Sequence, residues 1–146
     1  MPFSVVVTVP TMRMGRLWKK LGKAASAAMF VGRRVAGWAD TTITPVNTVE
    51  YYQSVVKKMG ANETKDFTRL FMVPGMAHCR GGDGPDTFDT IATLETWREK
   101  GVTPATIPAK NLKSGLSRPL CAFPQYAKYK GTGDLKDASN WTCTAP

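Results

Sequence analysis

Two side chains of this sequence, Asp40 and His78, are of types that carry out acid–base chemistry together. His78 is the only histidine in the chain, and an imidazole can gain and lose a proton near neutral pH. A carboxylate that binds one ring nitrogen orients the imidazole and stabilises its protonated form, so the other nitrogen can take a proton from a nucleophile. Taken alone, however, a single histidine is more often structural, and an aspartate before a threonine-rich loop is often a turn residue.

The predicted elements put both residues on loops that follow strands. A short apolar stretch from Val35 leads into Asp40. Residues 67–73 become continuously apolar, as a strand does when it enters a buried sheet, and a Pro-Gly pair ends them. His78 lies in the glycine-rich loop 74–85 that comes next.

Two helices are predicted, one between these strands and one after them. Asn47, followed three residues later by Glu50, forms a capping-box-like start for the first helix, whose apolar stripe ends at Gly60. Asp86 and Asp89 mark the predicted start of the second helix, which should run to about Lys100 with Gly101 as its stop.

The alternation of strands and helices favours an α/β fold with a mostly parallel sheet and flanking helices. In such folds functional residues gather beyond the C-terminal ends of the strands. An acid after one strand and a histidine after the next follows the Ser, Asp, His order of α/β-hydrolases, in which the nucleophile comes earlier in the chain. Residues 117–146 are predicted to be irregular structure wrapped against this domain.

The sequence around both residues resembles one known family. Residues 70–79 read Leu-Phe-Met-Val-Pro-Gly-Met-Ala-His-Cys and are followed by a second glycine-rich stretch, and Gly-Trp-Ala-Asp stands at 37–40. These segments are similar to the histidine loop and the acid loop of the tannase and feruloyl esterase family. The resemblance covers residues 35–143 and continues through segments at 47–52, 117–121, 124–131 and 140–143.

This resemblance implies that residues 35–146 are the C-terminal part of an α/β-hydrolase domain, with Asp40 as the acid and His78 as the base of a serine esterase triad. The implied substrates are phenolic or aromatic esters, such as galloyl or feruloyl esters. Family members are generally exported, which implies a secreted or periplasmic protein, although the chain has no clear signal peptide. No cofactor is expected, because the calcium site of the family belongs to a lid that this chain lacks.

The nucleophile of the family has no counterpart in this chain. Neither Gly-x-Ser-x-Gly nor the family's Cys-Ser pair occurs in the sequence. The resemblance implies that the missing N-terminal half of the domain is the partner of this chain, which alone is expected to be inactive. Residues 1–34 are unlike the family and are expected to be poorly ordered. A truncated or misread gene and a fragment both fit this pattern.

The three cysteines fit no spacing of zinc ligands, and no metal site is expected. They allow one disulfide and leave one thiol over. By the family pattern Cys79 bonds to a cysteine beside the nucleophilic serine, so here it is expected to be unpaired. Cys121 and Cys143 are then the expected disulfide, with two reduced cysteines as the alternative.

Charge and hydropathy argue against nucleic-acid and membrane partners. The net charge of +9 comes mainly from residues 1–36, which hold seven basic and no acidic residues and contain no recognisable nucleic-acid-binding motif. No apolar run approaches the roughly 18 residues of a membrane span. Besides a serine esterase fragment, the alternative function is a noncatalytic remnant or a basic binding module.

Overall fold

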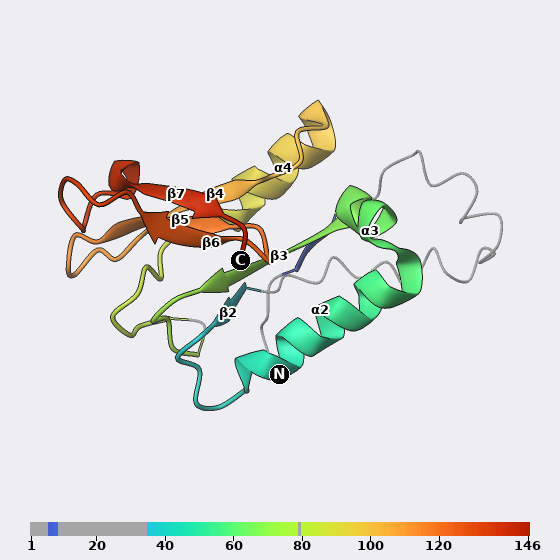
Figure 1. Ribbon diagram of the computed structural model, residues 1–146, viewed down its shortest axis with the longest axis horizontal. Coiled ribbons are helices and arrows are strands. Elements are labelled where there is room, and N and C mark those ends of the chain that lie inside the picture. Colours follow the sequence, from blue (N-terminus) through green and yellow to red (C-terminus); the bar gives the residue numbers. More distant parts are fainter. Residues whose placement is uncertain (1–5, 9–34, 79) are drawn as a thin grey trace.

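The computed structural model describes residues 6–8, 35–78 and 80–146. Its helices and strands surround one central strand, β3, and Figure 1 shows their arrangement. In chain order they are β1 (Val6–Thr8), β2 (Val35–Gly37), α2 (Pro45–Met59), α3 (Ala61–Phe67), β3 (Thr68–Val73), α4 (Thr90–Lys100), β4 (Thr106–Lys110), β5 (Ser117–Cys121), β6 (Tyr126–Tyr129), the 3-10 helix η2 (Ala138–Asn140) and β7 (Trp141–Thr144).

Strand β3 lies between two neighbours in a three-stranded sheet of order β1-β3-β2. β2 pairs with it in parallel, with Gly37 opposite Val73, and β1 pairs with it antiparallel. Beyond β1, the same edge of β3 meets Ala122, which follows β5. The two remaining sheets are the antiparallel pairs β4–β5 and β6–β7. The expectation of poor order for residues 1–34 lies outside the described residues, except for β1.

The sheet is therefore not the mostly parallel one that the sequence predicted. Among the described strands only β2 and β3 run parallel, and the other pairs are antiparallel. A parallel pair needs a long crossover, which α2 and α3 provide, whereas short connections join β4 to β5 and favour a hairpin. The sheets of this chain are small and mixed.

Helix α2 begins two residues before its predicted start. Pro45 occupies the first turn, where a residue without an N–H group costs no hydrogen bond, and Thr44 precedes the helix without a side-chain cap. Asn47 therefore lies inside the helix, and the predicted capping box is wrong. The predicted end at Gly60 is confirmed, and a further short helix, α3, follows before β3.

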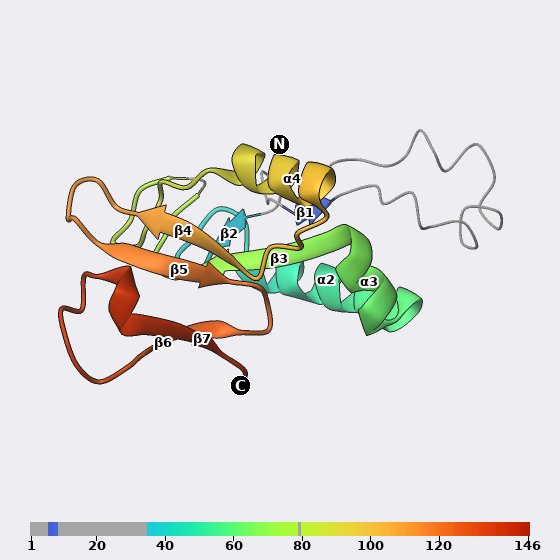
Figure 2. The ribbon, with the colours of Figure 1, turned by 90° about the horizontal axis from the view of Figure 1, so that it is seen from above.

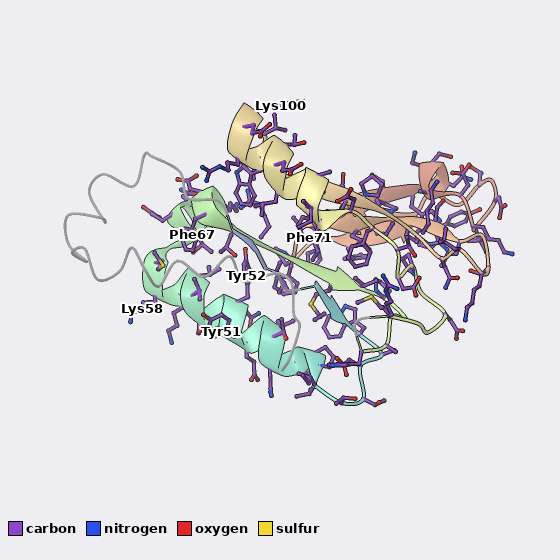
Figure 3. The ribbon with its side chains drawn as sticks, turned by 180° about the vertical axis from the view of Figure 1, so that it is seen from behind. Tyr51, Tyr52, Lys58, Phe67, Phe71 and Lys100 are labelled. Carbon is purple, nitrogen blue, oxygen red and sulfur yellow. A yellow bond between two sulfur atoms is a disulfide. The ribbon has the colours of Figure 1, made fainter. Side chains whose placement is uncertain are left out.

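The apolar stripe of α2 packs on one face of the sheet. Tyr52 is buried against Leu70 and Met72, and Val49 and Val56 pack beside it. Figure 3 shows Tyr52 on the side of α2 that faces the sheet. These contacts confirm the predicted packing of the helix on a sheet.

The opposite face of β3 is buried as well. Phe71 and Val73 are fully buried and form a second core cluster with Ile107, Ala109 and Leu120 of the β4–β5 pair. Because successive side chains of a strand point to opposite faces, burial on both sides explains the uninterrupted apolar run of β3.

Helix α4 is shorter than predicted. It begins at Thr90, because Asp89 is the N-cap and its carboxylate accepts a hydrogen bond from the N–H of Ala92. Of the two aspartates predicted to mark this end, Asp89 is confirmed, whereas Asp86 lies one turn before the helix begins. Gly101 ends the helix in a left-handed conformation, as predicted.

The C-terminal residues contain more regular structure than the sequence predicted. Strands β5, β6 and β7 hold 13 of the 30 residues from 117 to 146, and Figure 2 shows the β6–β7 pair lying beside the β4–β5 pair. The packing of this region includes the indole of Trp141, with the Arg118 guanidinium 3.7 Å from its ring centre. Pairing as short antiparallel strands satisfies the backbone of segments too polar to look like buried strands.

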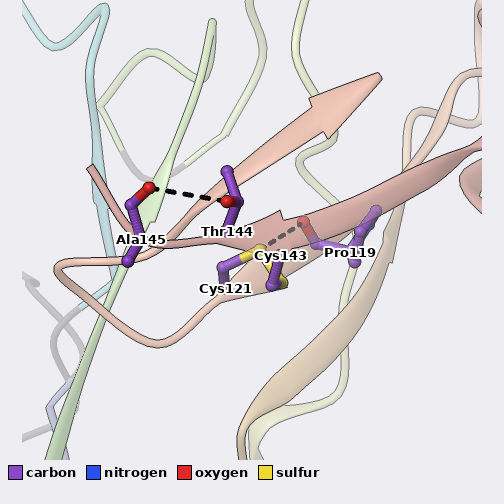
Figure 4. Close-up of a disulfide and its surroundings, with 5 residues drawn as sticks. All are labelled: Pro119, Cys121, Cys143, Thr144 and Ala145. Atoms are coloured by element: carbon purple, nitrogen blue, oxygen red, sulfur yellow. Dashed lines mark hydrogen bonds between the residues drawn. A yellow bond between two sulfur atoms is a disulfide. The ribbon is translucent and has the colours of Figure 1, made fainter. Parts of the chain in front are cut away.

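A disulfide joins β5 to β7 and confirms the expected pair Cys121–Cys143 (Figure 4). Its Cα atoms are 5.7 Å apart, within the normal range for a disulfide. The bond closes a long loop of sequence, since the two cysteines are 22 positions apart. The expectation for Cys79 lies outside the described residues.

Replacing both bridge cysteines with serine is expected to lower the free energy of unfolding by about 3 kcal/mol, because the unfolded chain regains the entropy of an open loop. Denaturant unfolding of the purified chain measures this difference. Cys79→Ser is the matched control and should leave the Cys121–Cys143 bond intact in non-reducing peptide maps. A non-reducing map of the wild-type chain in which Cys79 is bonded to Cys121 or Cys143 would contradict the assigned pairing.

Candidate active site

Asp40 lies in a tight turn directly after β2. Its Oδ1 atom accepts hydrogen bonds from the N–H groups of Thr42, at 2.8 Å, and Ile43, at 2.9 Å. This Asx turn fixes the side chain to its own loop. The second carboxylate oxygen, Oδ2, is therefore held in a defined direction.

His78 lies near the tip of a loop that folds back on itself after β3. We call residues 75–84, apart from Cys79, the histidine hairpin. Its first arm is bonded to its second through Ala77 N–H to the Gly81 carbonyl and Gly84 N–H to the Gly75 carbonyl, both at 3.0 Å. The hairpin, and His78 with it, follows β3 at the edge of the sheet where β2 and β3 end together.

Backbone contacts hold the Asp40 turn against this hairpin. The N–H of Trp38 donates to the Val73 carbonyl at 2.9 Å, and the N–H of Ala39 donates to the Met76 carbonyl at 3.1 Å. At Gly37 a Cβ atom would lie 2.0 Å from the Met76 oxygen, so any side chain there would push the two loops apart. The glycine of the Gly-Trp-Ala-Asp segment thus permits the close approach.

The structure brings the two sequence-predicted residues together. His78 Nδ1 and Asp40 Oδ2 are 2.8 Å apart, which is a hydrogen bond. The Asp40 side chain is 10% exposed and that of His78 is 38% exposed, so the imidazole is open to a reactant while its partner is shielded. The predicted contact between these residues is confirmed.

The charge state of Asp40 fixes the tautomer of His78. Burial alone would raise the pKa of the Asp40 carboxyl, but hydrogen bonds from Ile43, His78 and Thr42 together hold that pKa below its ordinary value. An ionised carboxylate can only accept, so Nδ1 of a neutral His78 carries the proton and Nε2 has the free lone pair. Nε2 makes no hydrogen bond to another described residue.

An apolar cavity of about 110 Å³ adjoins these loops. Trp38 and Pro74, the first residues of the two loops after β2 and β3, line it together with Phe123 and Pro124. Trp38 is 47% exposed although it is large and aromatic. Such a surface suits a flat apolar group better than a charged one.

Two residues to which the sequence analysis gave no role at the site support the histidine hairpin. Asp86 accepts a hydrogen bond from the N–H of Gly81 at 2.8 Å, and the buried Asn111 donates to the Gly84 carbonyl at 2.8 Å. Asp86 was assigned instead to the start of a helix. Asn111 lies far away in the sequence, and an asparagine after a strand carries no local signal beyond a turn.

The part of the chain that the structure describes contains no group of three His, Cys, Asp or Glu side chains that could hold a metal ion. None of its helices is long and apolar enough to cross a membrane.

The fold and the family comparison define the class of this protein. An acid and a histidine on loops beyond the C-terminal ends of neighbouring strands also occur in this order in α/β-hydrolases. The family model described as "Tannase and feruloyl esterase" matches residues 33–144. The chain belongs to this family.

Individual relatives agree with this assignment. Mono(2-hydroxyethyl) terephthalate hydrolase of Piscinibacter sakaiensis is 40% identical over 116 residues, which cover 75% of this chain and 19% of that protein. A probable feruloyl esterase of Arthroderma benhamiae is 36% identical over 129 residues, which cover 81% of this chain and 24% of that protein. The crystal structure of an esterase from Aspergillus oryzae matches with a TM-score of 0.66 at 27% identity, over 82% of this chain and 29% of that one. The chain thus spans about a fifth to a quarter of the length of these curated relatives.

Asp40→Asn is expected to remove one pH-dependent part of the stability. Because the folded pKa of Asp40 lies below the ordinary value of about 3.9, its stabilising contribution is complete above that pH and is lost as the pH falls through the folded pKa. Urea unfolding of the wild type and of Asp40→Asn between about pH 2 and 7 measures this. The free energy of unfolding should be higher for the wild type at neutral pH, and the two values should converge at the acid end.

Asp83→Asn removes an exposed carboxylate of the neighbouring loop and is the matched control. At each pH the free energy of unfolding of Asp83→Asn should differ from that of Asp40→Asn by as much as the wild-type value does. If Asp40→Asn followed the wild type at every pH, the carboxylate would not be stabilised by its partners in the folded state.

Proposed function

We propose that this chain supplies the acid and the base of a serine-type carboxylic ester hydrolase. The 2.8 Å hydrogen bond between His78 Nδ1 and Asp40 Oδ2 is the observation that carries the proposal. It leaves Nε2 as an exposed base whose tautomer is fixed, as general-base chemistry requires. A noncatalytic remnant or a basic binding module needs no such pair.

In the proposed reaction His78 Nε2 takes the proton of a serine hydroxyl while the serine oxygen attacks the ester carbonyl. Asp40 stabilises the imidazolium that forms. When the tetrahedral intermediate collapses, the imidazolium gives its proton to the departing alkoxide and the acyl group remains on the serine. Water then attacks the acyl-serine with His78 again as the base, which releases the acid and restores the hydroxyl.

The serine in this proposal comes from polypeptide outside the present sequence. The sequence contains no Gly-x-Ser-x-Gly and no Cys-Ser pair, and the proposed partner is the N-terminal half of the α/β-hydrolase domain. In this proposal Cys79 would bond to a cysteine beside that serine, and a lid in the same half would hold the calcium ion.

The proposed substrates are small aromatic esters. Relatives named feruloyl esterase and mono(2-hydroxyethyl) terephthalate hydrolase support this class, because both names describe esters of aromatic acids. The apolar cavity adjoins the loops after β2 and β3, which carry Asp40 and His78, and Trp38 gives it an aromatic wall. A secreted or periplasmic location is proposed as well, and the Cys121–Cys143 disulfide supports it.

The purified chain is expected to hydrolyse methyl gallate, methyl ferulate and a nitrophenyl ester no faster than buffer, because it lacks the group that forms the acyl-enzyme. Turnover that a serine-directed inhibitor abolishes would contradict the absence of a nucleophile.

A chimera tests the proposed roles directly. Residues 35–146 replace the corresponding segment of the Piscinibacter sakaiensis terephthalate ester hydrolase, and its activity on that ester is measured. The chimera should be active, and Asp40→Asn or His78→Ala in it should lower kcat by roughly 10⁴-fold. Asp83→Asn is the control and should retain activity. An active chimera that tolerates His78→Ala would refute the proposed base.

A further inference from the structure

Asn111 is buried, with 7% of its surface exposed, and all four of its polar groups have partners. It follows directly after β4, in the turn that leads to β5. Its backbone N–H donates to the Leu116 carbonyl at 2.7 Å, and its carbonyl accepts from Gly115 N–H at 2.9 Å. The backbone groups therefore close the turn without the side chain.

The two ends of the Asn111 carboxamide have different partners. Oδ1 accepts from the N–H groups of Lys113 and Ser114, both at 3.1 Å, and so remains within the turn. Nδ2 leaves the turn and donates to the carbonyls of Gly84, at 2.8 Å, and Gly82, at 3.4 Å. Only Nδ2 contacts the histidine hairpin.

The carbonyls that Asn111 binds belong to the second arm of the histidine hairpin. That arm approaches the first so closely that a Cβ atom at Gly84 would lie 1.9 Å from the Pro74 carbonyl oxygen. The first arm is bonded to the Asp40 turn through the Met76 carbonyl. A shift of the second arm therefore moves the first arm, and with it the ring that must meet Asp40.

We propose that Asn111 is a positioning residue for His78, acting through its Nδ2 donations to the second arm of the histidine hairpin. It sets the direction in which the hairpin presents the imidazole to Asp40, although it touches neither residue. Asp86 also holds this arm, because its carboxylate accepts from the N–H of Gly81, but it is more exposed and bonds a single N–H group. The β4–β5 turn thus helps determine the geometry of the acid–base pair.

One substitution distinguishes this proposal from the alternative that Asn111 only closes the turn. In Asn111→Asp the carboxylate can still accept from Lys113 and Ser114, because aspartate closes Asx turns as well as asparagine does. The second oxygen, however, cannot donate, and it would face the carbonyl oxygens of Gly82 and Gly84. A turn residue would tolerate this change, whereas a residue that positions the hairpin would not.

The readout is the tautomer of His78, which a simple loss of stability does not change in the folded protein. Because the chain has a single histidine, nitrogen-15 NMR of the imidazole reports on this ring without ambiguity. At a pH where the ring is neutral, the wild type should show a protonated Nδ1, as the Asp40 contact requires. A ring released from Asp40 instead favours a protonated Nε2, the form preferred by free imidazole side chains in water.

The expected result is that Asn111→Asp shifts the ring from mainly Nδ1–H toward mainly Nε2–H. The matched control is Asn140→Asp, because Nδ2 of Asn140, at the end of η2, also donates to a backbone carbonyl, that of Asp134 at 2.9 Å. This control should keep the wild-type spectrum. Asp40→Ala gives the spectrum of a ring without its partner.

A folded Asn111→Asp protein with the wild-type tautomer would overturn the proposal. Near-UV circular dichroism and the intact Cys121–Cys143 bond establish folding. If the aspartate variant does not fold, Asn111→Ser decides the question, because its hydroxyl can cap the turn but is too short to reach both carbonyls. The serine variant should show the same shift, and a wild-type spectrum from it would equally overturn the proposal.

This positioning role takes its significance from the function proposed above for His78, but its test uses no ester. A changed tautomer in an enzyme that fails the chimera assay would refute the esterase proposal and leave the positioning role intact. An unchanged tautomer together with an active chimera would refute the positioning role and leave the esterase proposal intact.

Discussion

The pairing of β2 with β3 is the contact on which both the core and the candidate site depend. β3 is covered by α2 on one face and by the β4–β5 pair on the other, so Leu70 and Phe71 are fully buried in different clusters. Burial of this kind provides most of the free energy that holds a small domain together. Because β2 runs parallel to this strand, the loops after both strands emerge at the same edge.

The same pairing explains why two loops without regular structure can hold a precise contact. The Asp40 turn and the histidine hairpin are tied to each other by backbone hydrogen bonds at Trp38 and Ala39, and Gly37 leaves space for them. The Asp86 carboxylate, which accepts from Gly81 N–H, and the Asn111 amide, which donates to the Gly84 carbonyl, hold the second arm of the hairpin. Preorganisation of this kind spares an acid–base pair the cost of ordering at the moment of reaction.

Local sequence patterns correctly predicted features that local forces determine, namely the apolar run of β3 and the glycine stops at Gly60 and Gly101. The Asp40–His78 contact joins residues 38 positions apart, and it was predicted from the order of the two loops together with the family resemblance. The antiparallel strands after residue 105 were missed, because their alternation is weak and their pairing depends on partners distant in the sequence. Asn111 was missed for the same reason: its Nδ2 partners are 27 and 29 positions away.

The two carboxylate oxygens of Asp40 have different partners, since Oδ1 closes the turn and Oδ2 binds His78. Both roles restrict which amino acid can occupy this position. Glutamate would keep the negative charge, but its extra methylene group prevents the short ring that joins Oδ1 to the N–H groups of Thr42 and Ile43. Asparagine would keep that ring but lose the charge that stabilises an imidazolium. Aspartate alone combines a side chain short enough for the Asx turn with the negative charge of an acid. Glutamate and asparagine would each lose one of these two functions.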